Sequence, residues 1–272
     1  MHILVTGSDG YIGTHLVKNL LISGHSVDTL DKKKDGSAIF KLDITKEISS
    51  IPKEYDCIVH LAAKARVGES VQDPISYYET NTLGTLNVLR NLNCKRFVFA
   101  STGQAIHMGN PYSISKKAAE EIVSQYCITH NIPYTTFRFF NVIGSDGVMP
   151  TNPDALFFKL KEAATTGKFF VYGNTYNTPD GTCLRDYVHV NEICSALQEA
   201  TTYSTNQIEH LGHGKGYSVL EIANIFKRVN NVDFKIVIDY PRPGDIVSSV
   251  LDKPSLFMQS LYPIDELLKL PK

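Results

Sequence analysis

The start of the chain changes from one hydrophobic pattern to another within a few residues. Residues 2–6 form a short run of mostly apolar, partly β-branched side chains, which is typical of a buried strand. Apolar residues then recur with the period of a helix up to Leu21. Gly7, Gly10 and Gly13 stand at the junction of the two patterns, so the sequence predicts a strand, a glycine turn and a helix.

The alternation of strand and helix patterns continues along the chain. Further strands are predicted at 26–31, 38–42, 56–61 and 95–102. Pro74 and Pro111 suit the first turns of two later helices. Asn81 falls in the middle of the first of them, where asparagine is unfavourable, which predicts a buried hydrogen-bonding role for its side chain. Strands that alternate with helices predict an α/β fold, a doubly wound parallel sheet with its ligand at the carboxyl ends of the strands.

Composition narrows the class of protein. The 272 residues, 43% of them hydrophobic, suffice for a full core and an appended lobe, and a net charge of −1 gives no electrostatic footprint for nucleic acid or a membrane surface. The five cysteines have no metal-ligand spacing, so we expect reduced thiols and no metal site. No stretch approaches the ~20 apolar residues of a membrane span, and Met1 leads almost directly into the first strand, so we expect a cytoplasmic location.

The glycine turn is the first candidate for chemistry. Glycines let the backbone approach a pyrophosphate, and the first N–H groups of the following helix favour an anion. Asp31 ends the second strand, where a carboxylate can accept hydrogen bonds from both hydroxyls of an adenine ribose. Its charge disfavours a 2′-phosphate and therefore favours NAD over NADP. Lys32, Lys33 and Lys34 offer the opposite charge, and we interpret them as a solvated loop.

A Tyr-x-x-x-Lys pair is the second candidate. Tyr112 and Lys116 share one face of a predicted helix, and a neighbouring ammonium favours the phenolate, which is a usable base at neutral pH. Ser101 and Thr102 end the preceding strand, and a hydroxyl from either can bridge Tyr112 and a substrate oxygen. The pair alone also fits a surface lysine beside a packed tyrosine, but its place after the glycine turn and Asp31 favours chemistry.

In this order, the features resemble the extended short-chain dehydrogenase/reductase superfamily and, within it, the UDP-glucose 4-epimerases. The similarity runs to about residue 255, and the stretches that carry it are 5–13, 67–70, 77–85, 112–116, 139–144, 172–190 and 241–245. It implies an NAD-binding Rossmann domain at 1–145 plus 186–212, with a smaller interleaved substrate domain at 146–185 plus 213–272.

The resemblance also implies roles for the matching positions. Catalysis would rest on Tyr112, Lys116 and Thr102, with Ser101 as second choice. NAD would be held by Gly7, Gly10, Tyr11, Ile12, Gly13, Asp31, Asp43, Ile44, Leu61, Ala62, Ala63, Asn81, Tyr112 and Lys116. A UDP-sugar would be held by Asn141, Tyr172, Arg185, Tyr187, Arg242 and Asp245, and two arginines suit a diphosphate because each offers paired donors.

Some features depart from the family pattern. The stretches between Asp31 and Asp43 and between Thr102 and Tyr112 are both shorter than in typical epimerases. The family's lysine after the fourth strand is displaced, because Lys64 stands one position early. The residue at the aligned place is Ala65.

The expected activity is reversible epimerisation at C4 of a UDP-hexose through a 4-keto sugar with tightly bound NAD. The substrates would be UDP-glucose and UDP-galactose or their N-acetylated forms, and the small Ser249 favours the latter by resemblance. The alternatives are another NAD-dependent nucleotide-sugar enzyme, a 4,6-dehydratase or a decarboxylase, and a non-catalytic NAD-binding protein. By resemblance, a 4,6-dehydratase would have an Asp-Glu pair after Thr102 to eliminate water. This chain has Gly103 and Gln104 there, which disfavours dehydration. The resemblance also implies a homodimer formed through the helices at 74–93 and 111–130.

Overall fold

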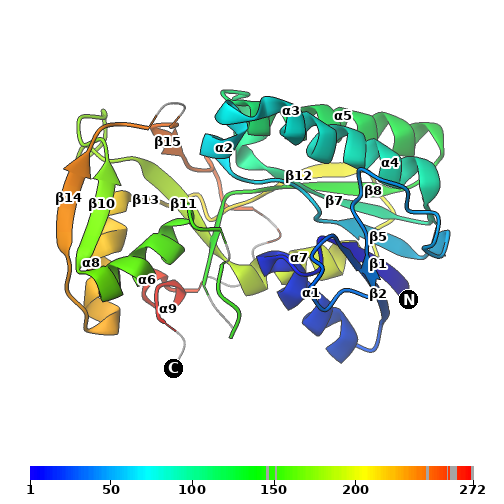
Figure 1. Ribbon diagram of the computed structural model, residues 1–272, viewed down its shortest axis with the longest axis horizontal. Coiled ribbons are helices and arrows are strands. Elements are labelled where there is room, and N and C mark those ends of the chain that lie inside the picture. Colours follow the sequence, from blue (N-terminus) through cyan, green and yellow to red (C-terminus); the bar gives the residue numbers. More distant parts are fainter. Residues whose placement is uncertain (145–146, 151, 243–244, 256, 258–261, 271–272) are drawn as a thin grey trace. The chain divides into compact units, whose positions relative to one another are not determined.

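Seven strands form the main sheet in the computed structural model, which describes residues 1–144, 147–150, 152–242, 245–255, 257 and 262–270. The order of its seven strands is β12-β8-β7-β5-β1-β2-β3 (Figure 1). Their bounds are β1 His2–Thr6, β2 Ser26–Asp31, β3 Phe40–Lys41, β5 Cys57–His60, β7 Phe97–Thr102, β8 Tyr134–Phe139 and β12 Gln207–Leu211. Neighbours from β3 to β7 run parallel, and the chain builds first one side of β1 and then the other. The predicted doubly wound sheet is confirmed.

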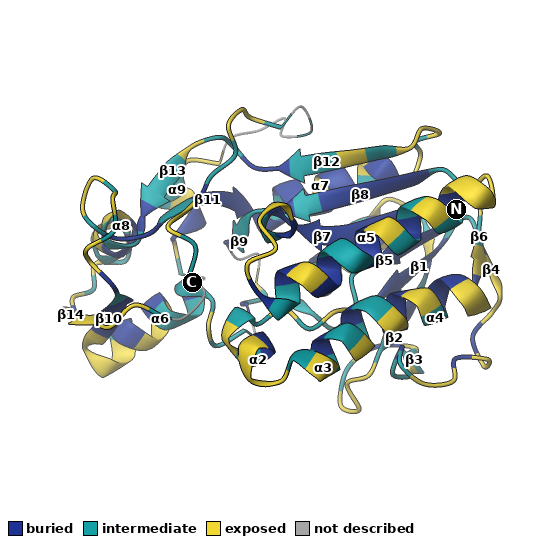
Figure 2. Ribbon diagram, turned by 90° about the horizontal axis from the view of Figure 1, so that it is seen from above, coloured by how far each residue is buried: buried dark blue, intermediate teal, exposed yellow. Residues whose placement is uncertain are grey.

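Helices cover both faces of the sheet (Figure 1). α4 (Gly84–Asn91) and α5 (Pro111–Thr129) lie on one face, whereas α1 (Tyr11–Ile22) and α7 (Val190–Ala200) lie on the other. Strands β5 and β7 are buried at every residue, because a central strand of such a sheet has helices above and below it. Figure 2 shows buried and exposed residues alternating around α4 and α5, as expected of amphipathic helices that turn one face to a core.

Two predicted elements differ from the structure. The strand expected at 38–42 is reduced to β3, which pairs only with the end of β2. The helix that begins at Pro74 is divided into α3 (Pro74–Tyr77), a π-helical turn η1 (Tyr78–Leu83) and α4. The smaller elements of this region are β4 (Glu54–Tyr55), β6 (Asn93–Cys94), α2 (Val67–Gln72) and the 3-10 turn η2 (Gly103–Ile106).

A second group of elements is built around β11 (Leu184–His189). Strand β13 (Gly216–Ser218) pairs with it antiparallel, and β9 (Asn141–Ile143) and β15 (Ser248–Ser249) pair with it parallel. The remaining elements are the parallel pair β10 (Lys168–Tyr172) and β14 (Lys235–Asp239) and the helices α6 (Leu156–Thr166), α8 (Val219–Asn230) and α9 (Ile264–Leu267). Phe157, Phe169 and Phe226 pack at the centre of its core.

The contacts divide the chain into two compact units. Unit 1 comprises Met1–Arg138 and Cys194–Glu209, and unit 2 comprises Phe139–Ile193 and His210–Lys272. β11 therefore belongs to unit 2 throughout, whereas the sequence analysis divided it at residue 186, and the functional domain boundaries stay a prediction. Among the described residues, no helix is both long enough and apolar enough to span a bilayer.

Candidate active site

The glycine turn connects β1 to α1 at the carboxyl edge of the sheet. Gly7 has a φ of 72°, and a Cβ on it would lie 2.7 Å from the backbone nitrogen of Ala62. A Cβ on Gly13 would collide with the carbonyl oxygen of Gly7. Gly10 is the N-cap of α1, and no side chain caps that end. The glycines therefore bring two strand ends close together and leave the first N–H groups of α1 available to an anion.

A pocket with about 530 Å³ of empty space lies beside this turn. Eight predicted cofactor residues line it, namely Gly7, Gly10, Asp31, Asp43, Ile44, Leu61, Ala62 and Ala63. The pocket is also lined by Leu30, Leu42 and Thr80, which were not predicted to bind the cofactor. Lys32 lines it as well, although the sequence was interpreted as placing this lysine in a solvated loop. Tyr11, Ile12, Gly13, Asn81, Tyr112 and Lys116 do not line it.

The composition of the pocket matches the parts of a dinucleotide. Leu30, Ile44 and Leu61 offer apolar surface to a base, Asp31 offers a carboxylate to a ribose, and the glycine turn offers N–H groups to a pyrophosphate. The residues present therefore fit NAD. Among the described residues, no group of three or more His, Cys, Asp or Glu side chains is arranged to hold a metal ion.

Thr102 and Tyr112 lie together at the end of β7 and the start of α5. Asn110 begins α5 with a reciprocal pair of capping hydrogen bonds to Ser113, which fixes the turn that carries Tyr112. Burial raises the pKa of Tyr112 above 10, and a hydrogen bond with the Thr102 side chain lowers it in part. The hydroxyl beside Tyr112 is thus that of Thr102, the preferred residue of the sequence analysis.

Lys116 lies one turn further along α5 and is only 3% exposed. Its Nζ lies 4.2 Å from the centroid of the Phe99 ring, and burial lowers its pKa to about 7. The predicted lowering of the Tyr112 pKa by Lys116 is not seen in the protein alone, because desolvation of the phenol outweighs other influences. At neutral pH the phenol of Tyr112 is therefore uncharged, and the amine of Lys116 is close to the midpoint of its titration.

A buried acid that the sequence analysis missed follows Lys116 by one turn. Glu120 is 1% exposed and accepts hydrogen bonds of 2.8 and 2.6 Å from Arg138 on β8. Burial raises the pKa of Glu120, but the hydrogen bonds from Arg138 and the charges of Arg138 and Lys117 outweigh this effect and lower it below the ordinary value. Its charge in turn raises the pKa of Lys116 against the effect of burial. Lys116 and Glu120 are four residues apart, a spacing that places two side chains on the same face of a helix, and this spacing was the signal in the sequence by which Glu120 could have been found.

Asn81 is fully buried in η1 and bonds to protein groups. Its Oδ1 accepts from the backbone N–H of Lys64 at 2.8 Å, and its Nδ2 donates to the Lys64 carbonyl and to Ser115 Oγ, both at 3.0 Å. The expected buried hydrogen-bonding role is confirmed. The residue joins the segment after β5 to the turn of α5 that carries Tyr112 and Lys116, and a direct cofactor contact stays a prediction.

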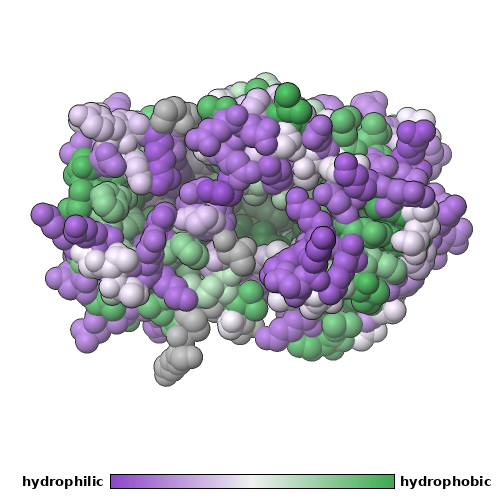
Figure 3. Space-filling model, viewed as in Figure 1, coloured by the Kyte–Doolittle hydropathy of each residue, from purple (hydrophilic) through white to green (hydrophobic). Residues whose placement is uncertain are grey.

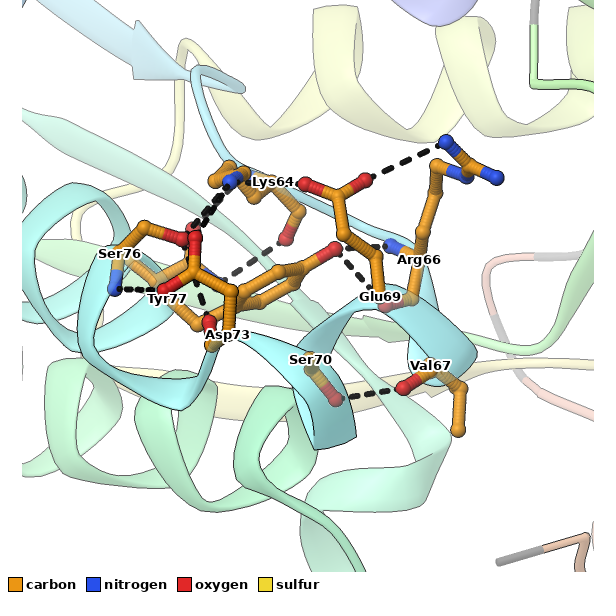
Figure 4. A network of polar contacts seen from close by, with 9 residues as sticks. Lys64, Arg66, Val67, Glu69, Ser70, Asp73, Ser76 and Tyr77 are labelled. Atoms are coloured by element: carbon orange, nitrogen blue, oxygen red, sulfur yellow. Dashed lines mark hydrogen bonds and ion pairs between the residues drawn. The ribbon is translucent and has the colours of Figure 1, made fainter. Parts of the chain in front are cut away.

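The ammonium of Lys64 lies among polar side chains of α2 and α3 (Figure 4). Its Nζ lies 2.7 Å from Glu69 Oε1 and 2.7 Å from Ser76 Oγ, and Asp73 is 3.8 Å away. The same Nζ lies 5.0 Å from the centroid of the Tyr77 ring. Lys64 thus ties α2 to α3, in keeping with its displaced position in the sequence.

Unit 2 brings together most of the side chains predicted for the nucleotide sugar. The guanidinium of Arg242 lies 3.6 Å from the centroid of the Tyr172 ring. Burial raises the pKa of Asp245, while the charges of Arg185 and Arg242 lower it. These four side chains combine an aromatic face with two guanidinium groups, a composition suited to a base and a diphosphate. Pro243 and Gly244 of this stretch lie outside the described residues.

The other two predicted substrate residues lie on paired strands. Asn141 pairs with Tyr187 between β9 and β11, and its Nδ2 donates to the Asp186 carbonyl at 3.3 Å. Tyr187 is 4% exposed and packs in the hydrophobic core of unit 2. Its ring supports β11, and a substrate contact by it stays a prediction.

Comparisons with known proteins define the class. Residues 3–211 match the family model "NAD dependent epimerase/dehydratase family". The chain belongs to this family, which confirms the resemblance and the NAD cofactor.

Individual relatives indicate a narrower group within this family. The chain is 31% identical over 294 residues to UDP-glucose 4-epimerase of Yersinia enterocolitica, covering 90% of this chain and 88% of the relative. Among solved structures, UDP-glucose 4-epimerase of Thermotoga maritima with UDP-glucose has a TM-score of 0.88 at 28% identity, covering 98% of this chain and 96% of its own. The enzyme of Bifidobacterium longum in complex with NAD+ and UDP has a TM-score of 0.87 at 26% identity, with the same coverage. Within the family, the chain groups with the UDP-glucose 4-epimerases.

Proposed function

We propose that this protein is an NAD-dependent isomerase that inverts C4 of a UDP-hexose reversibly. The observation that carries the proposal is that one unit contains both the Thr102, Tyr112 and Lys116 set and a pocket that fits NAD, in a chain that is similar over 90% of its length to a UDP-glucose 4-epimerase. NAD, held by the residues that line the pocket, would supply a reversible hydride acceptor for a sugar carbon. The alternatives, a dehydratase or decarboxylase and a non-catalytic NAD-binding protein, predict other products or none.

The chain's own residues have distinct roles in this proposal. Tyr112 takes the proton of the 4-hydroxyl as C4 is oxidised and gives it back when C4 is reduced. Thr102 holds the same sugar oxygen by a hydrogen bond, and Lys116, when protonated, stabilises the Tyr112 phenolate. Arg185 and Arg242 hold the diphosphate. The 4-keto sugar must present both faces in turn, so binding through UDP leaves its ring free to rotate.

A product assay tests the proposal. Purified protein given UDP-galactose without added nucleotide is expected to form UDP-glucose, measured by chromatography. Tyr112→Phe should lower the rate at least ~100-fold, the usual contribution of a general base, while Tyr126→Phe on the same helix should not. Formation of a 4-keto-6-deoxy sugar, or an unchanged rate in Tyr112→Phe, would contradict it.

The N-acetylated UDP-sugars are included among the proposed substrates. Ser249 pairs with Arg185 between β15 and β11, so a small side chain stands next to a proposed diphosphate ligand. We expect turnover of UDP-N-acetylglucosamine, and Ser249→Tyr should reduce this activity more than that with UDP-glucose. Turnover of UDP-glucose alone by the unmodified protein would restrict the substrate range.

A homodimer in the cytoplasm is also proposed. The exposed apolar side chains on α3, η1, α4 and α5 are Ile75, Leu83, Leu86, Ile114 and Ile128. Figure 3 shows hydrophobic atoms along the upper edge of unit 1, over these helices. Such a set favours a protein interface, and light scattering of the purified protein tests it. All five cysteines are free thiols, which supports a reducing compartment.

A further inference from the structure

The shortened connection between β2 and β3 is held by one residue of the glycine turn. Asp9 Oδ1 accepts hydrogen bonds from the Ser37 backbone N–H at 2.9 Å and from Ser37 Oγ at 2.7 Å. Its Oδ2 accepts from the Ala38 N–H at 3.2 Å. A single carboxylate thus receives three hydrogen bonds from a segment about thirty positions later in the chain.

The same residue is bonded to the acid that ends β2. The backbone N–H of Asp9 donates to Asp31 Oδ2 at 3.1 Å, and the N–H of Lys33 donates to Asp31 Oδ1 at 3.0 Å. Asp9 therefore connects the glycine turn, the carboxylate of Asp31 and the short connection, all at one end of the cofactor pocket.

The connection between β2 and β3 has little regular structure and little apolar contact. None of residues 32–39 belongs to a helix or strand, and Lys32–Asp35 and Ser37 are exposed. Ala38 is buried, at the position where Asp9 accepts one of its bonds. With so little apolar contact, hydrogen bonds hold the connection in place. Ser37 and Ala38 bond to Asp9, Lys33 bonds to Asp31 and Ile39 bonds to Thr29.

Gly36 shows how closely the connection approaches Asp9. A Cβ on Gly36 would collide with Asp9 Oδ2, although the φ of this glycine is not in the left-handed region. The absence of a side chain at Gly36 therefore leaves room for the Asp9 carboxylate, and the backbone conformation does not call for glycine. Substitution of Gly36 by alanine would displace the carboxylate from its partners.

The charges of this end of the pocket oppose each other. Burial raises the pKa of Asp9, but its bonds to Ser37 and Ala38 and the charge of Lys33 outweigh that effect and hold it below 3.8. Asp9 is ionised at neutral pH, so it adds a second negative charge beside Asp31. Lys33 faces Asp9, and the carbonyl of Lys34 accepts a hydrogen bond from Lys41 Nζ at 3.0 Å.

We propose that Asp9 is a positioning residue that sets the choice of nucleotide. It ties the short connection to the glycine turn and so fixes Asp31 and Lys32, which both line the pocket, in an arrangement that leaves the Asp31 carboxylate to the ribose hydroxyls. The site then binds NAD and rejects its 2′-phosphorylated form although three lysines stand next to it. The proposal goes beyond the family assignment, which says nothing of Asp9.

Two variants disrupt the hydrogen bonds between Asp9 and the segment of Ser37 and Ala38, one at each side of the contact. Asp9→Ala removes the acceptor, and Gly36→Ala displaces it while retaining the acid. We expect trypsin to cleave after Lys32–Lys34 about tenfold faster in both variants, the order of effect expected from the loss of charge-assisted hydrogen bonds. When the proteins are stripped of bound nucleotide and then incubated with equal NADH and NADPH, the ratio of bound NADH to bound NADPH should also fall about tenfold.

The matched control is Asp35→Ala, which removes the same charge from an exposed position next to Gly36 and should change neither readout. In the Asp9→Ala background, Gly36→Ala should add little, because the two changes break the same contact. Thermal unfolding checks that each variant is folded. If Asp9→Ala does not fold, the two measurements on Gly36→Ala still test the proposal. An unchanged nucleotide ratio, even with weaker binding of both nucleotides, would show a merely structural Asp9 and overturn the proposal.

Discussion

The candidate site residues of unit 1 and of unit 2 are held in different ways. In unit 1, Thr102 and Lys116 are buried, and Asn81 and Glu120 fix the turns around them through hydrogen bonds. In unit 2, Arg185 and Arg242 are long, partly exposed side chains, and one of them rests on an aromatic ring. Groups that move a proton need fixed positions, whereas a sugar that must rotate is better held through its nucleotide. The comparison predicts that changes in unit 1 affect kcat and changes in unit 2 affect KM.

Lys116→Met should have the largest effect. It removes the cation beside Tyr112 and should lower kcat at least ~100-fold, with KM for the UDP-sugar little changed. Lys95→Met, an exposed lysine of unit 1 paired with Asp56, is the matched control and should stay near the unmodified rate. A steady-state result in which only KM rises would contradict the separation of roles.

Arg242→Lys should have the next largest effect, on binding. Lysine keeps the charge but loses the planar fork and its stacking on Tyr172, so KM should rise about tenfold with kcat within a few-fold. The control is Arg228→Lys on α8, where the exposed arginine is paired with Asp265. A drop in kcat at constant KM would place Arg242 in the chemistry instead.

Glu120→Gln should shift the pH dependence of kcat. Burial lowers the Lys116 pKa to about 7 and Glu120 opposes this effect, so removing the negative charge lowers the Lys116 pKa further. The protonated form of Lys116 is then lost at lower pH, and the alkaline limb of the kcat profile should move to lower pH.

Glu121→Gln provides the comparison for that shift, because Glu121 is exposed on the same helix. Its profile should coincide with that of the unmodified protein. A uniform loss of rate in Glu120→Gln with no movement of the limb would show that Glu120 supports only the fold.

Lys64→Met should have the smallest effect. The ammonium is held by Glu69 and Ser76, so its loss should lower the melting temperature slightly and leave the retention of bound NAD within about twofold. Chromatography of nucleotide released from equal amounts of protein measures the retention. Loss of NAD from this variant during purification would restore a cofactor role to the displaced lysine.

The sequence predicted the parts of the site that depend on local spacing. The glycine turn, Asp31 at the end of β2 and the Tyr112–Lys116 helix face follow from residues near one another in the chain, and the pocket contains most residues expected to line it. The particular bond between Glu120 and Arg138 was not predictable, because it depends on β8 lying beside α5. The net direction of the Tyr112 pKa was missed because burial, which spacing does not reveal, exceeds the effect of any neighbour.

The bonds around Asp9 and the π-helical turn show the same limit. Asp9 could be read as one residue of a glycine turn, but its partners Ser37 and Ala38 approach it only because the connection to β3 is short and folds back. The buried role of Asn81 was expected from an asparagine in mid-helix, whereas the π-helical turn that carries it was not.

The central claim is that one hydride leaves C4 and returns to the same carbon while Tyr112 moves the proton. UDP-glucose deuterated at C4 tests it most directly, with an excess of unlabelled NADH in solution and the product examined by NMR. We predict UDP-galactose that carries the full deuterium label at C4. Loss of the label to the nucleotide pool or to water would contradict the account.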